Sequence, residues 1–447
     1  MDTKREIGIT EKLSVGQSLF YGVQSVIALN LFLAAIIIAG MLQLDIVDTA
    51  ILITLSFLAS GVATLIQAGL FMKYPVVQGV SYATMGALAA IAYAHDLATA
   101  FGSLILGAVI LIVLGYFKLF SKIMVIIPPI VAGVVIMVIG INVMYTACIN
   151  LITAPGDTGA NFLLAAIAFV LIFVFKTIGN TNLPIAGICG RGGVLMAIVI
   201  ATIVAALMHQ TDFSIVASQP WVAAPPIFHY GFVKFDLPSS LVFIFIYFIV
   251  MIETIGNWFA ISHTAKSPIQ NKEIDKGIMG EGLGALIGAF IGSAPVTSYA
   301  TNCGIISITK VYSRWSAVGA GAIVVVLAFI PKLMYVIAAL PSTILWGVLI
   351  ALTVSILTSG LRSIHKFPLT ERNILIIGIP IALTLLTGMI PQAIVGAMPM
   401  FLSYLFSSSI CIGAIAAIVI NLVLPKDKDV PNDGSKHEDQ DMAIEEA

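Results

Sequence analysis

Two acidic residues lie inside strongly apolar stretches of the chain and are the first candidates for chemistry. Glu253 interrupts the run LVFIFIYFIVMIETIGNWFA, and Glu281 lies within GIMGEGLGALIGAFIG. A carboxylate in such surroundings costs several kcal/mol unless it is paired or protonated. Acids kept at that cost inside apolar segments usually bind a substrate or relay protons. We therefore predict that these two carboxyl groups carry the function.

The two acids suit different tasks. A carboxylate at the position of Glu253 can accept two N–H groups of a polar heterocycle, which predicts a substrate-binding role. The apolar, glycine-rich surroundings of Glu281 favour its protonated form, which suits proton exchange. In a simpler alternative, Glu253 lies at a helix end that reaches the interface with water. Glu281 would then pair with Lys272 or Lys276.

A short repeated motif indicates the elements that position these acids. The tetrapeptide Ser-Tyr-Ala-Thr occurs at 81–84 and again at 298–301, each time shortly after a Pro-Val pair. Proline disfavours helix in the residue before it, and the β-branched and aromatic residues that follow favour extended backbone. We predict a short strand leading into a half-helix in both segments, with the two helix N-termini directed at a shared site.

Aromatic and polar residues near these motifs are candidates for ligand contacts. Tyr82 and Tyr299 could stack on a planar ligand, although an aromatic side chain in an apolar helix more often only packs. Asn302 is predicted at or near the N-cap of the second half-helix, where capping alone could explain it. Asn257 follows Glu253 by one helical turn and could orient it.

The composition places these segments in a membrane. Hydrophobic residues make up 60% of the 447 residues and charged residues only 10%, whereas soluble domains carry about 25% charged residues. Apolar stretches close to the roughly 20 residues of a bilayer-crossing helix recur along the chain. We predict an all-α membrane protein with fourteen transmembrane segments, near 14–40, 47–71, 75–94, 97–117, 123–144, 160–179, 192–209, 239–262, 277–294, 297–312, 315–340, 342–362, 372–390 and 400–424.

The charges support this count, because Lys and Arg collect in cytoplasmic loops. With the N-terminus inside, all of the 21 basic residues except Lys234 and Lys332 fall on the cytoplasmic side. Both termini are therefore predicted to be cytoplasmic. The third and tenth segments are equivalent members of two seven-span halves, which predicts inverted repeats with a site at the bilayer midplane. The acidic segment 426–447 is predicted to be a disordered tail.

The sequence lacks the signatures of other classes of protein. It contains no phosphate-binding loop, no metal-ligand or CxxC spacing and no Ser/His/Asp set at membrane depth. We therefore predict no enzyme, no catalytic residue and no metal site. The absence of a basic patch argues against nucleic-acid binding. A secondary transporter and a passive channel remain as candidate functions. Only the transporter would accumulate a solute against its concentration gradient.

Several of these residues resemble the nucleobase–ascorbate transporter family, also called the xanthine/uracil permease family. The most specific match is the motif TNCG at 301–304 followed by TK at 309–310. The segments IIPPIVAGVVIMVIGIN and LPSTILWGVLIALTVSILTSGLR are similar to the fifth and twelfth helices of that family. The motif QGVSY at 78–82 is similar to its purine carriers. The resemblance covers roughly residues 7–425 and implies a bacterial purine-type member.

The resemblance implies a homodimer of elevator-like transporters. Spans 1–4 (13–118) and 8–11 (238–340) would form a core domain. Spans 5–7 (119–237) and 12–14 (341–425) would form a gate domain, with residues 1–12 and 426–447 in the cytoplasm. Together with the residues themselves, it predicts substrate binding by Glu253, Tyr82, Tyr299, Ala300, Thr301 and Asn302, proton coupling by Glu281, and support from Asn257, Ser25 and Gln78.

Three departures from the family pattern bear on the substrate. Thr301 stands where a Glu or Gln is common, Asn257 where a His or Asp is common, and Ser25 where a His is common. The short side chain of Thr301 predicts a wider pocket, which favours a purine base such as xanthine, hypoxanthine or guanine over uracil. The prediction is a purine:proton symporter in the cell (inner) membrane, with H⁺ as the coupling ion and no organic cofactor. The alternatives are a uracil:proton symporter, coupling to Na⁺, a passive solute channel and a fold-related anion carrier, although two buried acids argue against an anionic substrate.

Overall fold

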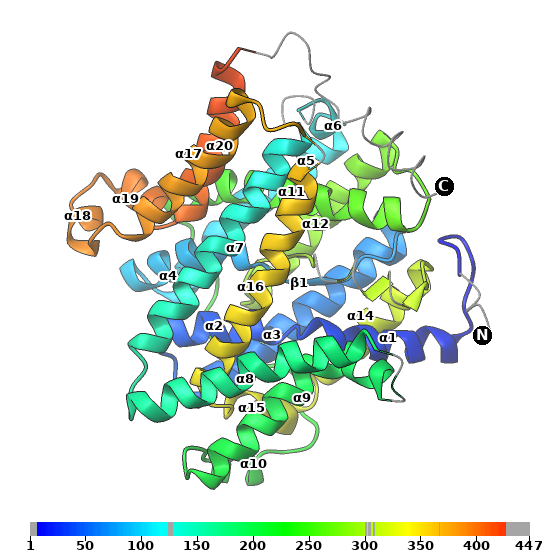
Figure 1. Cartoon of the computed structure of the whole chain (residues 1–447), viewed down its shortest axis with the longest axis vertical. Helices are drawn as coiled ribbons and strands as arrows, with labels where there is room; N and C mark the ends of the chain where they lie inside the picture. Colours follow the sequence, from blue (N-terminus) through cyan, green and yellow to red (C-terminus); the bar gives the residue numbers. More distant parts are fainter. Residues whose placement is uncertain are drawn as a thin grey trace.

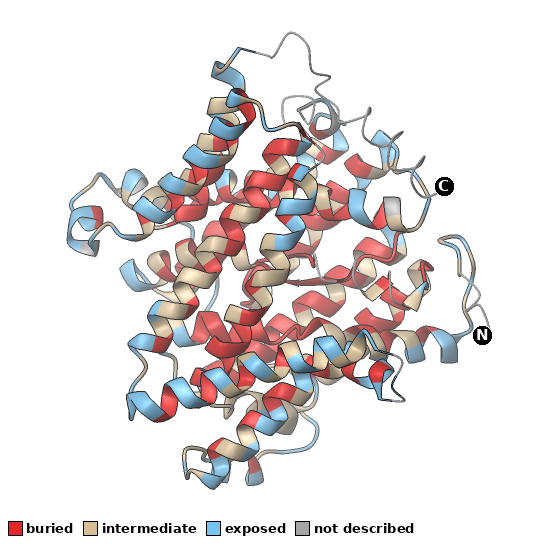
Figure 2. Cartoon of the chain, viewed as in Figure 1, coloured by how far each residue is buried: buried red, intermediate tan, exposed pale blue. Residues whose placement is uncertain are grey.

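The computed structural model of the chain describes residues 7–123, 128–181, 183, 185–299, 302, 305, 306, 309–365 and 367–425. Ala300, Thr301 and the predicted tail 426–447 lie outside the described residues, as do residues 1–6 of the predicted N-terminal segment. The described chain is mostly helical, as predicted, and its buried residues gather in the middle of the molecule (Figure 2).

Helices and two short strands follow the predicted apolar segments (Figure 1). The first half contains α1 (Val15–Leu29), α2 (Leu33–Met41), α3 (Ile46–Thr64), the π-helix η1 (Leu65–Phe71), β1 (Gln78–Val80), the 3₁₀ turn η2 (Tyr82–Thr84), α4 (Met85–Ala94), α5 (Leu97–Tyr116), α6 (Phe120–Ile123), α7 (Pro129–Ile152), α8 (Thr158–Gly179), α9 (Ala186–Leu207) and α10 (Ser214–Ala217). The second half contains α11 (Leu237–Thr264), α12 (Asn271–Ile291), β2 (Val296–Ser298), α14 (Arg314–Leu327), α15 (Pro331–Ala338), α16 (Ser342–His365), α17 (Glu371–Gly388), α18 (Gln392–Gly396), α19 (Met400–Phe406) and α20 (Ser409–Val423).

Eight helices in the described part of the chain are long and apolar enough to cross a membrane, and the bent pair α14–α15 would make a ninth. Two of the eight are composite, since α1 with α2 forms Val15–Met41 and α3 with η1 forms Ile46–Phe71. Shorter apolar helices occupy Tyr82–Ala94, Gly192–Leu207 and Ser409–Val423. A multi-pass helical membrane fold is therefore confirmed, whereas the count of fourteen spans stays a prediction.

The two predicted strands are present and pair with each other near the centre of the molecule (Figure 1). β1 and β2 are antiparallel, with Gln78 opposite Ser298, and both are fully buried. Pairing satisfies their backbone groups where water is absent, which is the condition for extended backbone at membrane depth. β1 continues through η2 into α4, so the first predicted half-helix is confirmed. The second falls largely outside the described residues.

Several predicted segments have different bounds in the structure, among them 123–144, 315–340 and 400–424, the last of which is divided into α19 and α20. Helix α7 begins at Pro129 and continues to Ile152, so the prediction of 123–144 was wrong at both ends. At its start, Pro129 suits the first position of a helix. At its end, the helix continues past residue 144 through Tyr145, Thr146 and Asn150, whose polar side chains line a cavity. The predicted span 315–340 is bent by 89° between α14 and α15, where Pro331 begins a new helix.

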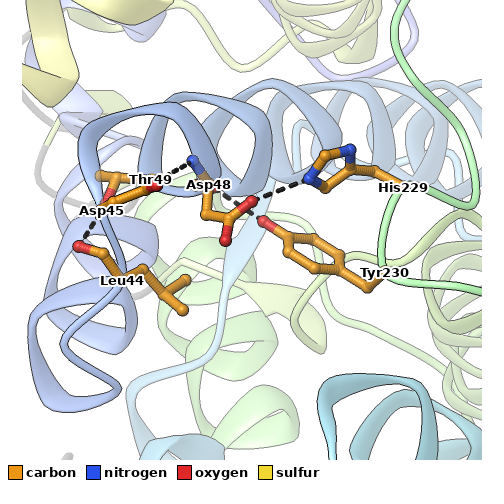
Figure 3. Close-up of polar contacts among 6 residues, drawn as sticks. All are labelled: Leu44, Asp45, Asp48, Thr49, His229 and Tyr230. Atoms are coloured by element: carbon orange, nitrogen blue, oxygen red, sulfur yellow. Dashed lines mark hydrogen bonds and ion pairs between the residues drawn. The ribbon is translucent and has the colours of Figure 1, made fainter.

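The long loop 218–236, between α10 and α11, folds over the N-terminal end of α3. His229 Nε2 lies 2.8 Å from Asp48 Oδ1, and Tyr230 Oη donates to the Asp48 carbonyl oxygen at 2.7 Å (Figure 3). These two contacts reach the side chain and the backbone of the same residue. The loop is therefore attached to the end of a membrane helix.

The two basic residues that the charge pattern leaves outside the cytoplasm both have partners connected with this loop. Lys234 forms an ion pair with Asp96, the N-cap residue of α5. Its hydrogen bond holds the pKa of the Asp96 carboxyl at about 2, below the ordinary value. Lys332 Nζ lies 4.8 Å from the centre of the Trp221 ring, a cation–π contact. Both exceptions are thus paired.

Candidate functional site

Glu281 lies in a buried, hydrogen-bonded cluster where α12 meets the two strands. Its side chain is 2% exposed. Oε1 accepts hydrogen bonds from Gln78 Nε2 at 3.0 Å and from Ser298 Oγ at 2.8 Å. Gln78 and Ser298 face each other in the β1–β2 pair, so the strand pairing brings both donors to one carboxyl group. These strand contacts take the place of the pairing with Lys272 or Lys276 that the simpler alternative requires.

Glycines let α12 come close enough for these contacts. A Cβ atom at Gly280 would lie 1.9 Å from Gln67 Oε1, and one at Gly282 would lie 2.8 Å from the Ala108 carbonyl oxygen of α5. Small residues allow helices in membranes to pack with their backbones close together. The glycine-rich sequence around Glu281 therefore holds its carboxyl group against η1 and the strands.

Helix α11 is joined to β2 by three hydrogen bonds. Thr254 Oγ1 lies 2.6 Å from Thr297 Oγ1. Asn257 Nδ2 donates to the Ser298 carbonyl oxygen at 3.3 Å, and Trp258 Nε1 donates to Ser298 Oγ at 2.8 Å. Residues spaced i, i+3 and i+4 share one helix face. This face of α11 is therefore attached to the strand that also serves Glu281.

Glu253 lies next to this face and is partly exposed. No hydrogen bond joins its side chain to another residue of the described chain, and Asn257, predicted to orient it, binds β2 instead. Glu253 is near enough to Glu281 for the two carboxyl groups to interact electrostatically. The two predicted acids therefore influence each other, and among the described residues only Glu281 has hydrogen-bond partners for its carboxyl group.

The two repeat-related tyrosines lie side by side. The ring centres of Tyr82 and Tyr299 are 6.0 Å apart, with their planes at 37°. A Cβ atom at Gly79 would lie 2.3 Å from the Tyr299 ring, so only glycine leaves room for the ring over β1. Tyr299 is buried, whereas Tyr82 is partly exposed and lines a cavity.

Asn302 and Ser25 lie around Pro75, at the entrance to β1. Asn302 Nδ2 donates to the Pro75 carbonyl oxygen at 2.6 Å, and Ser25 Oγ donates to the Tyr21 carbonyl oxygen of its own helix at 3.2 Å. Both residues line a small cavity with Pro75. The Asn302 contact fixes the backbone before β1, whereas the Ser25 contact stays within α1. The predicted contacts of Ala300 and Thr301 lie outside the described residues.

A cavity of about 290 Å³ opens beside Tyr82, between α2, α4, α7, α17 and α20. Its volume is close to the lower end of the usual range for small-molecule sites. The polar lining on α7 was not predicted from the sequence, although Asn142, Tyr145, Thr146 and Asn150 follow one another at helical spacing. The polar lining consists of Asn142, Tyr145, Thr146, Asn150, Thr387, Ser407, Ser408 and Ser409.

Comparisons with known proteins bear on the family. The permease family model Xan_ur_permease matches residues 16–393. The chain is 32% identical over 424 residues to the "Putative purine permease CPE0397" of Clostridium perfringens (strain 13 / Type A), covering 93% of this chain and 92% of the relative. It is 29% identical over 385 residues to the uric acid permease PucJ of Bacillus subtilis (strain 168), covering 83% of this chain and 84% of the relative.

The fold also has a solved counterpart. The transmembrane domain of the cyanobacterium bicarbonate transporter BicA matches with a TM-score of 0.63 and 16% sequence identity, covering 86% of this chain and 98% of that chain. At this identity the likeness concerns the fold alone. The family match extends over most of the membrane part and agrees with the motifs at both strands. This chain therefore belongs to the xanthine/uracil permease family and is a transporter rather than an enzyme.

Proposed function

We propose that the chain is a secondary transporter that takes up purine nucleobases together with protons. One observation carries the proposal: two acidic side chains share a buried site, and their surroundings differ. Glu281 is held by donors from both strands, whereas Glu253 lies beside β2 without a partner among the described residues. This difference supports a proton-exchanging role for the first and a base-binding role for the second.

The surroundings of Glu253 suit a planar heterocycle with N–H groups. The carboxylate could accept two such groups. Tyr82, which lines the cavity and lies beside Tyr299, could stack on the ring. In this proposal the backbone of Ala300 and Thr301 completes the contacts, with Tyr299 behind Tyr82 and Asn302 holding the entrance to β1. The relatives named above carry purine and uric acid in their names, which supports a purine over uracil.

The helix contacts support a division into a core domain and a gate domain. One set of extensive contacts pairs α5 with α12, α1 with α14 and α3 with α14, and another pairs α7 with α16, α8 with α9 and α17 with α20. The sets coincide with the proposed core (13–118 and 238–340) and gate (119–237 and 341–425). If the chain has two seven-span halves, α1 is equivalent to α11, α3 to α12 and α5 to α14. The α1–α14 contact is then equivalent to the α11–α5 contact, and the α3–α14 contact to the α12–α5 contact. This correspondence supports inverted repeats and fourteen spans.

In the same proposal the core domain moves against the gate domain in an elevator-like manner. The cavity beside Tyr82 lies where α2 and α4 of the core meet α7, α17 and α20 of the gate. A base bound at Tyr82 would therefore face the boundary that moves. We place the protein as a homodimer in the cell (inner) membrane with both termini cytoplasmic, an orientation supported by the pairing of Lys234 and Lys332.

Uptake of a panel of bases across pH tests the proposal. Labelled xanthine, hypoxanthine, guanine, uric acid and uracil are offered to proteoliposomes under an inward proton gradient, with and without Na⁺. Purines are expected to accumulate when the outside is acidic and to compete with one another, with uracil a weak competitor.

The same assay separates the rival functions. Preferred accumulation of uracil would identify a uracil symporter, and accumulation that needs Na⁺ would replace the proton as the coupling ion. Flux that equilibrates each base without accumulation would identify a passive channel and overturn the proposal.

A further inference from the structure

The hydroxyl group of Ser298 lies between three polar side chains of the Glu281 cluster. Trp258 Nε1 donates to Ser298 Oγ at 2.8 Å, and Gln78 Nε2 donates to it at 3.3 Å. Indole and amide N–H groups can only donate. The single hydroxyl hydrogen of Ser298 must therefore point to the third neighbour, Glu281 Oε1, at 2.8 Å.

This arrangement makes the two carboxyl oxygens of Glu281 unequal. Oε1 accepts from Ser298 and Gln78. Oε2 is buried and has no hydrogen-bond partner within the described chain. A hydrogen on Oε1 would meet two donor hydrogens, so the protonated acid carries its hydrogen on Oε2.

Trp258 is packed so that its N–H keeps this direction. The side chain is fully buried, and a Cβ atom at Gly277 of α12 would lie 2.5 Å from its ring. The Gly277 carbonyl oxygen accepts from Gln67 Nε2 at 3.0 Å, which anchors this turn of α12. The ring is therefore wedged between β2 and the helix that carries Glu281.

We propose that Trp258 and Ser298 are positioning residues of the coupling site, which keep Oε1 of Glu281 as an acceptor and leave Oε2 to take up and release the proton. The inference rests on the proposed function of Glu281. Trp258 shares α11 with Glu253, and Ser298 directly precedes Tyr299. A shift of either element when a base binds therefore alters the hydrogen bonds to Glu281, which links occupancy of the base site to protonation.

The other ionisable groups around Glu281 are few in the described chain. Glu253 and Tyr247, both on α11, interact with it electrostatically. Helices α3, η1 and α5 pack against α12. The part of α3 and η1 from 49 to 71 and the part of α5 from 97 to 115 contain no ionisable residue. Lys122 of α6 is exposed. The test below leaves all of these groups unchanged.

The test is the pH dependence of labelled xanthine uptake by the full-length chain in proteoliposomes, together with xanthine binding in detergent. Ser298→Ala removes a donor that favours the charged carboxylate, so the midpoint of pH-dependent uptake is expected to move toward alkaline pH. A shift of about one pH unit corresponds to one hydrogen bond to a charged group. Trp258→Phe keeps an aromatic ring without the N–H and is expected to move the midpoint less. Ser298→Thr keeps the hydroxyl and should restore the wild-type midpoint.

Two comparisons make the outcome specific. Ser103→Ala is the matched control, because Ser103 is equally buried but donates to the Thr99 carbonyl oxygen of its own helix. Its midpoint should equal that of the wild type. The double variant of Trp258→Phe and Ser298→Ala should match Ser298→Ala alone, since Trp258 acts through Ser298.

Equal pH midpoints for the wild type, Ser298→Ala and Trp258→Phe would overturn the inference. So would a double variant whose midpoint shift equals the sum of the two single shifts. If Ser298→Ala does not fold, Trp258→Phe against wild type decides. Wild-type protein that shows no pH-dependent uptake of any purine base in the panel would instead refute the proposed function.

Discussion

The carboxyl groups of Glu253 and Glu281 differ in their exposure and in their hydrogen bonds. Glu281 is enclosed and receives two hydrogen bonds through Oε1. Glu253 is partly exposed and has no hydrogen-bond partner among the described residues. Glu281 already has donors on Oε1, so we expect it to change its state by taking a proton on Oε2. Glu253 has no donor among the described residues, so we expect a ligand to supply one. Substitution of the two side chains should therefore affect different steps of transport.

Replacing each acid by its amide is predicted to separate binding from coupling. Glu281→Gln should keep xanthine binding but lose accumulation driven by a pH gradient, because the amide cannot exchange a proton. Glu253→Gln should weaken xanthine binding about 10- to 100-fold, since a hydrogen bond to a charged group contributes about 1.5–3 kcal/mol. Binding titrations and proteoliposome uptake measure the two effects separately. Full pH-dependent accumulation by Glu281→Gln would contradict its role, as would unchanged binding by Glu253→Gln.

The strand pair is the element that assembles the site. β1 and β2 each supply a partner for Glu281, and β2 also attaches α11. Gly79 lies at the middle of β1, opposite Thr297, under the Tyr299 ring. Strand positions with no side chain often mark the close approach of another group. The spacing between the strands and the tyrosine pair therefore depends on this residue.

Gly79→Ala is predicted to disturb the site through the Tyr299 ring. The added Cβ atom would lie 2.3 Å from that ring, so the ring or the strand must move. Overpacking of this kind costs about 1–3 kcal/mol, and a lower melting temperature and weaker xanthine binding are expected. Gly378→Ala is the control, since no atom lies within 4 Å of its added Cβ. Equal melting temperatures for the two variants would show that the strand pair tolerates the methyl group.

The whole molecule is also held together outside its membrane helices, by the loop 218–236. This loop connects α10 of the proposed gate to α11 of the proposed core, yet its contacts at Asp48 (Figure 3) and at Asp96 are with the ends of α3 and α5. In an elevator-like movement, the part from His229 to Lys234 would therefore travel with the core.

The ion pair in this loop predicts a pH-dependent stability. The pKa of Asp96 in the folded protein, about 2, is below its ordinary value of 3.8. The contact with Lys234 therefore adds stability above about pH 4, and the contribution is lost as the pH falls toward about 2. At neutral pH, Lys234→Gln should have a lower melting temperature than the wild type. The loss in free energy of unfolding should be less than about 1 kcal/mol, because the pair is exposed. The two melting temperatures should converge in acid.

Lys332→Gln provides the control for this titration. Its ammonium group lies over the Trp221 ring and not beside Asp96, so its difference from the wild type should stay constant from about pH 6 to about pH 3. If the difference in melting temperature between Lys234→Gln and the wild type were equally constant with pH, the pKa shift of Asp96 could not be assigned to this ion pair.

Much of the architecture could be read from local patterns. Long apolar segments predicted the membrane helices, and the Pro-Val pairs before Ser-Tyr-Ala-Thr predicted the two strands. Glu253 and Glu281 stood out because a charge in an apolar run is costly wherever that run packs. Length, hydrophobicity and backbone preference belong to neighbouring residues. They can therefore be judged without knowledge of which segments meet.

The partners of these acids depended on packing between distant parts of the chain. Gln78 and Glu281 are 203 positions apart, and nothing in their own neighbourhoods indicates that one binds the other. Ser298 belongs to the repeated Ser-Tyr-Ala-Thr motif, but nothing in the motif indicates that its hydroxyl donates to Glu281. Trp258 gave no signal in the sequence, because a tryptophan in an apolar helix is usually a packing residue. The direction of a hydrogen bond is set by the positions of three elements at once. The identity and extent of the apolar segments were therefore local properties of the sequence, whereas the order of donors around Glu281 arose from the crossing of β1, β2 and α12 with α11.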